Sequence, residues 1–412
     1  MLCAYKSNEK RVCACCWRDG FGIVGEKFRR RLEMLLEDKL KNSGKKNFSS
    51  KGLKAELIQV KDYEQVLKVT DEESGLKGII AIHNTTLGPA LGGIRIYPYA
   101  TFDEALEDVL RLSKGMTYKS AVSETGLGGG KGVILADPAK KTPEMLLAFG
   151  AAVQSLGGNY ICAEDVGSTP EDMKLIRKAT KYVVGLPHAK SSGDPGFFTA
   201  WGVYRGIQAT CKAAFGTDSV EGKWIAIQGL GNVGWNLAQY LFWRGARLIV
   251  ADLDQRRVQQ AVIQFGAKAV SASEILQVEC DILAPCAMGG VINDQTTSQF
   301  RCRAIAGGAN NQLKKDSHAN QLRERGILYA PDFVINAGGL LNVTAEIEEE
   351  GYNPCFARNK VHAIYDTLGA IYEIARKNKE STHAAAVALA EYRIKYGIGR
   401  RFAPPVFHHA AE

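Results

Sequence analysis

The sequence predicts an α/β protein of two domains, the second of them a Rossmann-type unit, with a cleft between the two. Three observations predict this. A chain of 412 residues is too long for one typical domain. Apolar runs of strand length alternate with helical patterns from about residue 56 onward. A glycine fingerprint of the dinucleotide-binding kind follows one of these runs at Gly229–Gly234.

The first half contains the clearest single helix. Residues 101–121 carry apolar side chains at helical spacing, and Thr101 is expected to cap this helix, with Glu104 completing a capping box. The other elements expected in this half are strands over 78–85, 131–137 and 159–165 and a helix over 143–157.

The second half is expected to begin near Pro195 with a helix over 197–216 and to continue as strand, turn, helix and strand over 222–254. Further strands are expected in "CDILAPCA" and "RAIAGGAN", and the Ala-rich segment 357–400 is expected to be helical. We therefore divide the chain into four parts: an extension (1–55), a first α/β domain (56–190), a dinucleotide-binding domain (191–345) and a helical C-terminal segment (346–412).

The positive charge of the chain is concentrated at its start. The formal net charge is +8, and residues 1–55 alone hold 14 Lys or Arg against 6 Asp or Glu, so the remainder is neutral overall. The body therefore gives no electrostatic case for nucleic acid. We interpret the extension as a solvated, partly disordered lead-in with a short amphipathic helix over 25–42, and contact with acidic partners or a membrane surface is the alternative.

Composition excludes other classes. No apolar run approaches the roughly 20 residues of a membrane helix, so no membrane partner is expected. The six cysteines beyond residue 16 are scattered without the spacing of metal ligands, so no metal site is expected. A large chain with unpatterned cysteines is typical of a cytoplasmic enzyme.

The fingerprint in the second half predicts a dinucleotide site. Gly229, Gly231 and Gly234 follow an apolar strand and open a helix, and Asp252 ends the next strand about 20 residues on. The carboxylate of Asp252 can accept hydrogen bonds from both ribose hydroxyls and repels a 2′-phosphate, which favours NAD over NADP. Arg256 and Arg257 keep NADP open. The other residues expected to bind the cofactor are Leu230, Asn232, Val233, Cys286 and Ala287.

A second glycine-rich stretch, "ETGLGGGKGV" (124–133), is not a phosphate-binding loop. A P-loop needs a glycine at position 125 and a hydroxyl at 132, and the sequence has Thr125 and Gly132. The glycines can instead bring backbone close to Lys131 and remove water from it, which lowers the pKa of this lysine. Lys119, twelve residues earlier, would act as a second cation and lower it further.

Asp165, at the end of strand 159–165, completes the candidate site. Strand ends are where α/β proteins collect polar residues. Two lysines and a carboxylate facing a dinucleotide suit a small anionic substrate in the cleft. The alternative from the residues alone is that both lysines lie on the surface and Asp165 caps a helix.

Seven motifs carry a resemblance to a known family. The chain resembles the glutamate/leucine/phenylalanine/valine dehydrogenase family, most closely its leucine dehydrogenases, from about residue 56 to 400. The motifs are "TTLGPALGGIR" (85–95), "GMTYKSA" (115–121), "GLGGGKGV" (126–133), "AEDVGS" (163–168), "GLGNVG" (229–234), "GGANNQL" (307–313) and "PDFVINAGG" (331–339).

This resemblance implies an enzyme that oxidatively deaminates an L-amino acid with NAD to a 2-oxo acid and ammonia. Lys119 would pair with the substrate α-carboxylate, Lys131 would activate the attacking water, and Asp165 would handle protons at the amino group. Asn310 and the backbone of Gly92 and Gly93 would lie near substrate and nicotinamide. A homo-oligomer, an octamer by resemblance, is expected.

Substrate choice is argued from the positions expected to surround the side chain. Glutamate enzymes of the family hold the second carboxylate of their substrate with a lysine and a hydroxyl group. Those two positions correspond here to Leu91 and Val343. A buried γ-carboxylate would therefore lack partners, which disfavours glutamate as the substrate. With Ala163 and Leu340 these residues would form an aliphatic pocket that favours leucine. Leu340, larger than the valine expected in a typical leucine enzyme, leaves phenylalanine or another large apolar amino acid open. A non-catalytic NAD-binding regulator is the remote alternative.

Overall fold

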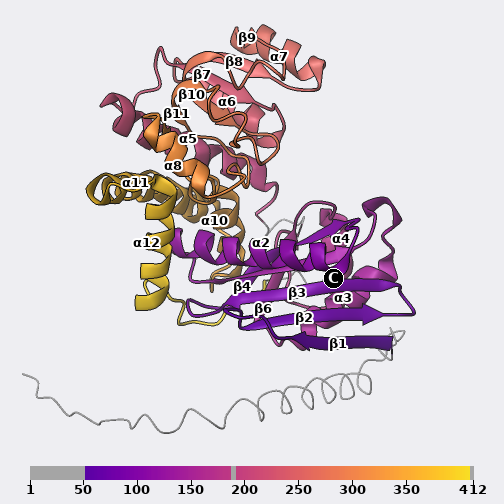
Figure 1. The fold of residues 1–412 in the computed structure, drawn as a ribbon. Coiled ribbons are helices and arrows are strands. Elements are labelled where there is room, and N and C mark those ends of the chain that lie inside the picture. Colours follow the sequence, from indigo (N-terminus) through magenta and orange to yellow (C-terminus); the bar gives the residue numbers. More distant parts are fainter. Residues whose placement is uncertain (1–51, 187–191, 409–412) are drawn as a thin grey trace, which may run out of the picture. The chain divides into compact units, whose positions relative to one another are not determined.

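The computed structural model describes residues 52–186 and 192–408. The extension expected over 1–55, with its helix at 25–42, lies almost entirely outside these residues. From Leu53 onward the chain forms one compact unit, which holds two separate six-stranded sheets (Figure 1).

The first sheet is mixed. Its strands lie in the order β1-β2-β3-β5-β4-β6, antiparallel from β1 to β5 and parallel from β5 through β4 to β6. They span Leu53–Ile58 (β1), Gln65–Asp71 (β2), Leu76–Asn84 (β3), Ala90–Tyr97 (β4), Gly128–Leu135 (β5) and Tyr160–Glu164 (β6). The parallel strands β4 and β6 end at the same edge, which brings the residues after β6 close to β4.

Helices cover both faces of this sheet. A side chain at Gly129 would meet Thr117 of α2, whereas one at Gly132 would meet Phe149 of α3, and positions of opposite parity point to opposite faces of a strand. The helical segments are α2 (Phe102–Val122), the 3₁₀ turn η2 (Pro138–Lys140), α3 (Pro143–Ser155) and α4 (Pro170–Ala179).

Helix α2 begins as predicted, with one difference. The Thr101 side chain accepts from the amide of Glu104 at 3.1 Å. The Glu104 carboxylate, however, accepts from the amide of Ala100 rather than from that of Thr101, so the reciprocal half of the predicted capping box is wrong. A full box forms instead at α4, between Thr169 and Asp172.

The second sheet is wholly parallel, in the order β12-β11-β10-β7-β8-β9. Numbered from β7, this is the Rossmann order 3-2-1-4-5-6, so the predicted fold class is confirmed. The strands span Trp224–Gln228 (β7), Arg247–Ala251 (β8), Lys268–Ala269 (β9), Glu279–Pro285 (β10), Arg301–Ile305 (β11) and Leu328–Tyr329 (β12).

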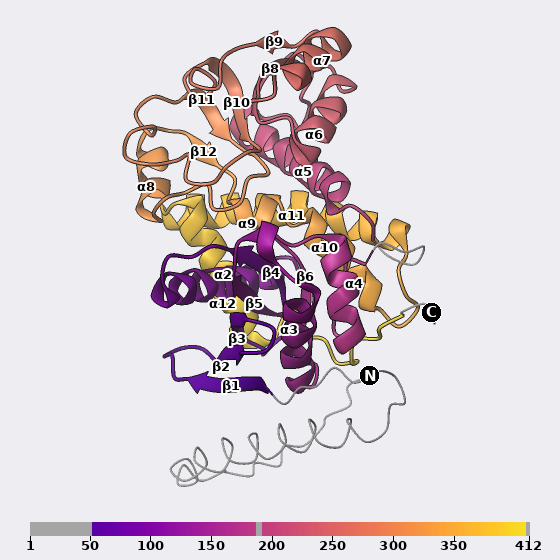
Figure 2. The ribbon, with the colours of Figure 1, turned by 90° about the vertical axis from the view of Figure 1, so that its right-hand side faces the viewer.

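The remaining helices surround this sheet and connect it to the first (Figure 2). They are α5 (Pro195–Phe215), α6 (Asn232–Phe242), α7 (Gln255–Phe265), α8 (Ser317–Glu324), α9 (Asp332–Ile335), α10 (Gly338–Thr344), η3 (Ala345–Ile347), α11 (Pro354–Asn378) and α12 (Thr382–Tyr396). Helix α11 packs on α5 and α12 on α2, so the last helices contact the helical layers of both sheets.

Three expectations differ from the structure. The segment 357–400 is two helices, because Lys379 takes the left-handed conformation (φ 55°) and ends α11. The strand expected from residue 131 begins at Gly128, so the glycines before Lys131 belong to it. Strand β4 was not predicted, because Gly92 and Gly93 interrupt its apolar pattern. Both glycines are needed there, because the backbone of Gly130 comes close to Gly92 and the backbone of Glu164 to Gly93.

Candidate active site

Lys131 lies in the middle of a central strand. It is 5% exposed and pairs in register with Ala81 of β3. A Cβ at Gly129 would lie 2.1 Å from the backbone nitrogen of Thr117, and one at Gly130 would lie 2.8 Å from the Tyr160 ring. The glycines from Gly128 onward therefore belong to the strand itself. They let α2 and Tyr160 pack directly on β5, and this packing keeps water from the lysine.

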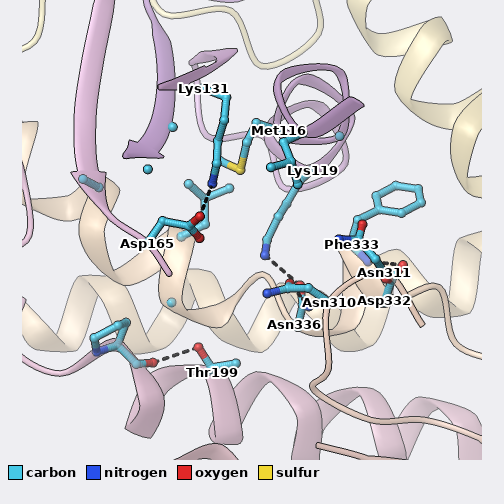
Figure 3. Close-up of a pocket in the computed structure, with 18 of the residues that line it drawn as sticks. Met116, Lys119, Lys131, Asp165, Thr199, Asn310, Asn311, Asp332, Phe333 and Asn336 are labelled. Atoms are coloured by element: carbon cyan, nitrogen blue, oxygen red, sulfur yellow. Dashed lines mark hydrogen bonds and ion pairs between the residues drawn. The ribbon is translucent and has the colours of Figure 1, made fainter. Parts of the chain in front are cut away.

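The carboxylate of Asp165 meets two cations where β6 ends. Its Oδ2 lies 2.8 Å from Lys131 Nζ (Figure 3). The same oxygen lies 3.0 Å from Arg95 Nε. Arg95 also binds Asp108 at 2.9 Å. A Cβ at Gly93 would lie 2.6 Å from the Asp165 Cβ, so the glycine makes room for this approach.

The environment shifts both members of the Lys131–Asp165 pair. Burial lowers the pKa of Lys131, and the nearby Asp165 carboxylate raises it again in part. The cation of Arg95, which was not among the predicted site residues, lowers it too. The pKa of Lys131 therefore stays below its usual value. Burial alone would raise the pKa of Asp165, but Lys131 and Arg95 more than offset this and lower it. The pair thus combines a lysine that loses its proton readily with a carboxylate that stays ionised.

Lys119 reaches the same space from the last turn of α2. Its Nζ donates to Asn336 Oδ1 at 2.7 Å, and Asn336 Nδ2 donates to Asn310 Oδ1 at 2.7 Å. The pKa of Lys119 is lowered to about 8, mainly by burial and in part by Lys131, while Asp332 and Asp165 oppose the shift. In Figure 3 the side chains of Lys119 and Lys131 extend into the same region, with Asn310 and Asn336 on the side of Lys119.

These side chains line a cavity of about 1140 Å³. One part of its wall is apolar, and all of the predicted substrate-binding residues contribute to the lining: Lys119, Leu91, Gly92, Gly93, Ala163, Leu340, Val343 and Asn310. Asn232 and Val233 at the start of α6 line it too, so the cavity extends from the two lysines to the predicted dinucleotide turn.

At the dinucleotide turn, backbone amides are available as hydrogen-bond donors, and Gly229 and Gly234 have little space for a side chain. Gly231 is the N-cap of α6 and offers no side-chain cap, so the first amides of this helix are available to an anion. Gly229 has φ 92°, and a Cβ at Gly234 would lie 1.9 Å from the Gly229 carbonyl oxygen. Asp252 follows β8, and its carboxylate accepts from the amides of Leu230 (2.5 Å) and Asp254 (2.8 Å).

The other predicted cofactor residues surround this turn. The amide of Cys286 donates to the carbonyl of Gln228 at 2.7 Å, and Ala287 lies against Gly229. Arg256 binds Asp254 at 3.1 Å, whereas Arg257 donates to the Leu230 carbonyl at 3.4 Å and thus lies beside the turn.

Much of the cavity lining was not among the predicted site residues, and Arg95, Met116, Thr199 and Asn336 are examples. Three of them, Arg95, Met116 and Asn336, lie inside motifs on which the family resemblance rests. Arg95 and Asn336 could have been found in the sequence, because each is a polar residue within a glycine-rich motif. Thr199 lies on α5, outside every motif, and gave no signal.

The described residues hold neither a metal centre nor a membrane helix. Nowhere in 52–186 and 192–408 do three or more His, Cys, Asp or Glu side chains group in a way that could hold a metal ion. Within the same ranges no helix is long and apolar enough to cross a membrane.

Comparison with protein families gives two matches. Residues 63–182 match the "Glu/Leu/Phe/Val dehydrogenase, dimerisation domain" and residues 250–396 the "Glutamate/Leucine/Phenylalanine/Valine dehydrogenase" domain. The dimerisation match indicates that the chain forms a homo-oligomer.

Curated relatives and solved structures agree with these matches. Leucine dehydrogenase of Geobacillus stearothermophilus is 53% identical over 82% of this chain and 92% of its own length. Phenylalanine dehydrogenase of Caldalkalibacillus thermarum is 45% identical over 82% of this chain and 92% of its own length. The crystal structure of L-tryptophan dehydrogenase from Nostoc punctiforme superimposes with a TM-score of 0.73 at 44% identity, over 82% of this chain and 97% of that one.

Proposed function

The chain belongs to the Glu/Leu/Phe/Val dehydrogenase family and is a leucine dehydrogenase-like amino-acid dehydrogenase, and from this premise we propose that it catalyses the reversible, NAD-dependent oxidative deamination of L-leucine. The products would be the 2-oxo acid and ammonia. The observation that carries the proposal is the buried Lys131–Asp165 pair, 2.8 Å apart, in one cavity with Lys119.

The residues at the turn fit a dinucleotide. Gly229 and Gly234 let the turn pack tightly, Gly231 leaves open space, and the start of α6 leaves amide donors for a pyrophosphate. Asp252, at the end of β8, favours ribose hydroxyls over a 2′-phosphate. The family uses NAD or NADP; we propose NAD for this chain. When bound, NAD supplies the acceptor for the hydride that leaves the substrate Cα.

The chain's own residues would handle the substrate and its protons. Lys119, while protonated, would bind the α-carboxylate, and its bond to Asn336 would hold it in place. Loss of the hydride leaves an imine on the substrate. Neutral Lys131 would take a proton from the water that attacks the imine carbon. The Asp165 carboxylate would take the proton that the substrate α-ammonium group loses before the hydride leaves, and would return it to the amino nitrogen of the water adduct. As the C–N bond breaks, the adduct's hydroxyl proton would go back to Asp165, so that ammonia leaves and the 2-oxo acid remains.

The apolar wall supports an aliphatic substrate. Leu91 is buried, and together with Ala163, Leu340 and Val343 it offers no partner to a second carboxylate. A second candidate is the same reaction on L-phenylalanine or another large apolar amino acid, which the departure at Leu340 leaves open.

A panel of L-amino acids tests both candidates. We expect NADH formation with leucine, valine and isoleucine, and the largest kcat/KM with leucine. A larger kcat/KM with phenylalanine would select the second candidate, and no turnover with any apolar amino acid would contradict the reaction itself. The same assay with NADP in place of NAD tests the role of Asp252.

Domain limits, assembly and location are proposals of the same kind. We propose a substrate domain over 56–190, an NAD domain over 191–345 and a C-terminal helical segment over 346–412, in an octamer located in the cytoplasm. The octamer rests on the family alone. Light scattering of the full chain would measure its mass, and a mass other than eight chains would contradict it.

A further inference from the structure

The ten residues Gly399–His408, which we call the C-terminal strap, come after the last helix. They lie outside the family match, which ends at residue 396, where α12 also ends. In both ribbon views the yellow segment after α12 runs back along the part of the molecule that holds the first sheet (Figures 1 and 2).

The strap is fixed at its start by Arg401. The amide of Arg401 donates to the Leu87 carbonyl at 2.8 Å, and its guanidinium binds Glu348 at 2.6 Å. A Cβ at Gly126 would lie 3.0 Å from the Arg401 Cβ, and one at Gly88 would lie 3.4 Å from it. Two glycines of the motif segments, neither with a part in the reaction, thus leave the space that Arg401 occupies.

The strap is fixed again at its end. The amide of Val406 donates to the Ile347 carbonyl at 3.1 Å, and Nε2 of His408 donates to the Glu348 carbonyl at 3.0 Å. Between these two bonds stands Phe407, whose ring meets Tyr182 edge-on at 5.5 Å between centroids.

Phe407 packs against a group of apolar side chains that also forms the cavity wall. The buried members of this group are Leu91, Leu127, Ile161, Val184, Leu340 and Ile347. Leu91 and Leu340 line the cavity, as do Ala163 and Val343, which pack on the same group. Because protein interiors are close-packed, a loss of volume at Phe407 lets these side chains move away from the cavity.

We propose that the C-terminal strap closes the apolar wall of the substrate cavity from outside, and that Phe407 is a positioning residue that limits the size of the substrate side chain. This role rests on the proposed function, since it concerns the same cavity. Phe407 acts through Leu340 and its neighbours and does not touch the substrate. The strap thereby links the end of the chain, which the family match does not include, to substrate choice.

The test compares kcat/KM for leucine and phenylalanine in Phe407→Ala, Phe407→Leu and a control, Phe402→Ala. Phe402 belongs to the same strap but is 92% exposed. In F407A we expect the leucine-to-phenylalanine ratio to fall about tenfold, mainly because KM for phenylalanine falls and KM for leucine rises. F407L should recover most of the wild-type ratio, and F402A should match wild type.

An unchanged ratio in folded F407A, or an equal loss of kcat for both substrates, would overturn the proposal. If F407A does not fold, Arg401→Met, which releases the start of the strap, should shift the ratio in the same direction, and an unchanged ratio there would overturn it too. Failure of the proposed function is a separate result: wild type would then turn over neither substrate. In that case calorimetric binding of 4-methylpentanoate and 3-phenylpropanoate replaces turnover, with the same expected shift in F407A.

Discussion

Two stretches of this chain are rich in glycine, residues 126–132 and 229–234, and they have opposite structural roles. In the first, the glycines from Gly128 onward are part of a buried strand, and their missing side chains are replaced by Thr117, Tyr160 and Phe149. In the second, Gly229 and Gly231 form a turn in front of a helix, and around Gly231 space remains open. The glycines of the first stretch serve packing within the protein. In the second stretch Gly229 and Gly234 do so too, and Gly231 leaves room for a ligand.

The element that comes after the glycines decides how such a motif is to be interpreted. Helix α6 begins directly after Gly231, whereas β5 simply continues through Lys131. A lysine inside a strand between two packed faces is dehydrated, which suits a base and not a phosphate ligand. Three experiments test whether the two stretches differ in this way, and one more tests the charge of Lys119, the second lysine of the cavity.

The largest effect is expected at the lysine that the first stretch buries. Replacement of Lys131 by Met removes the proposed base and should lower kcat about 10²–10⁴-fold, the usual range for general base catalysis. The measurement is NADH formation at saturating leucine and NAD. Lys174→Met, at a half-exposed lysine of α4, is the control and should keep full activity. A K131M rate within about threefold of wild type would show that the buried lysine is not the base.

The next effect concerns stability. A methyl group at Gly129 would lie 2.1 Å from the Thr117 backbone nitrogen, and backbone cannot move aside cheaply. We expect Gly129→Ala to lower the free energy of unfolding by about 3 kcal/mol, the upper part of the usual cost of overpacking. The control is Gly369→Ala in α11, where a Cβ meets nothing within 4 Å and alanine should raise stability by about 1 kcal/mol. Urea denaturation measures both, and equal stabilities would contradict the packing role.

The sequence predicts the structure around the second stretch more completely than the structure around the first. The dinucleotide turn obeys local rules, since strand, glycines, helix and Asp252 all lie within about 30 residues of each other. The residues around Lys131 follow no such local rule. Arg95 lies on β4 and Asp165 after β6, and the strand order β5-β4-β6 brings them together with Lys131. The bond from Lys119 to Asn336 joins residues 217 positions apart and left no local pattern.

The third experiment concerns the charge of Lys119. The pKa of this lysine is lowered to about 8, so below pH 8 it carries the charge that binds a carboxylate and above pH 8 it loses it. The inhibition constant of 2-hydroxy-4-methylpentanoate, which has no group titrating between pH 7 and 10, should therefore rise about tenfold per pH unit above 8. In Lys119→Arg, which stays charged, that rise should disappear. A pH-independent constant in wild type would contradict the carboxylate role.

The smallest effect, and the one that separates the two stretches most directly, is expected at Gly231. Its φ is −70°, and a Cβ there would have only Arg257 Nη1 nearby, at 3.9 Å. Gly231→Ala should therefore lower the free energy of unfolding by no more than about 1 kcal/mol, the cost of alanine in place of glycine at an N-cap. If a pyrophosphate approaches the start of α6, the added methyl group keeps it at a distance, and the Kd of NADH should rise about fivefold, a loss of about 1 kcal/mol. Fluorescence titration measures that Kd, with G369A as the control. Gly231 would then be needed for the ligand and Gly129 in β5 for the fold. A G231A variant as strongly destabilised as G129A, with unchanged NADH binding, would contradict that assignment.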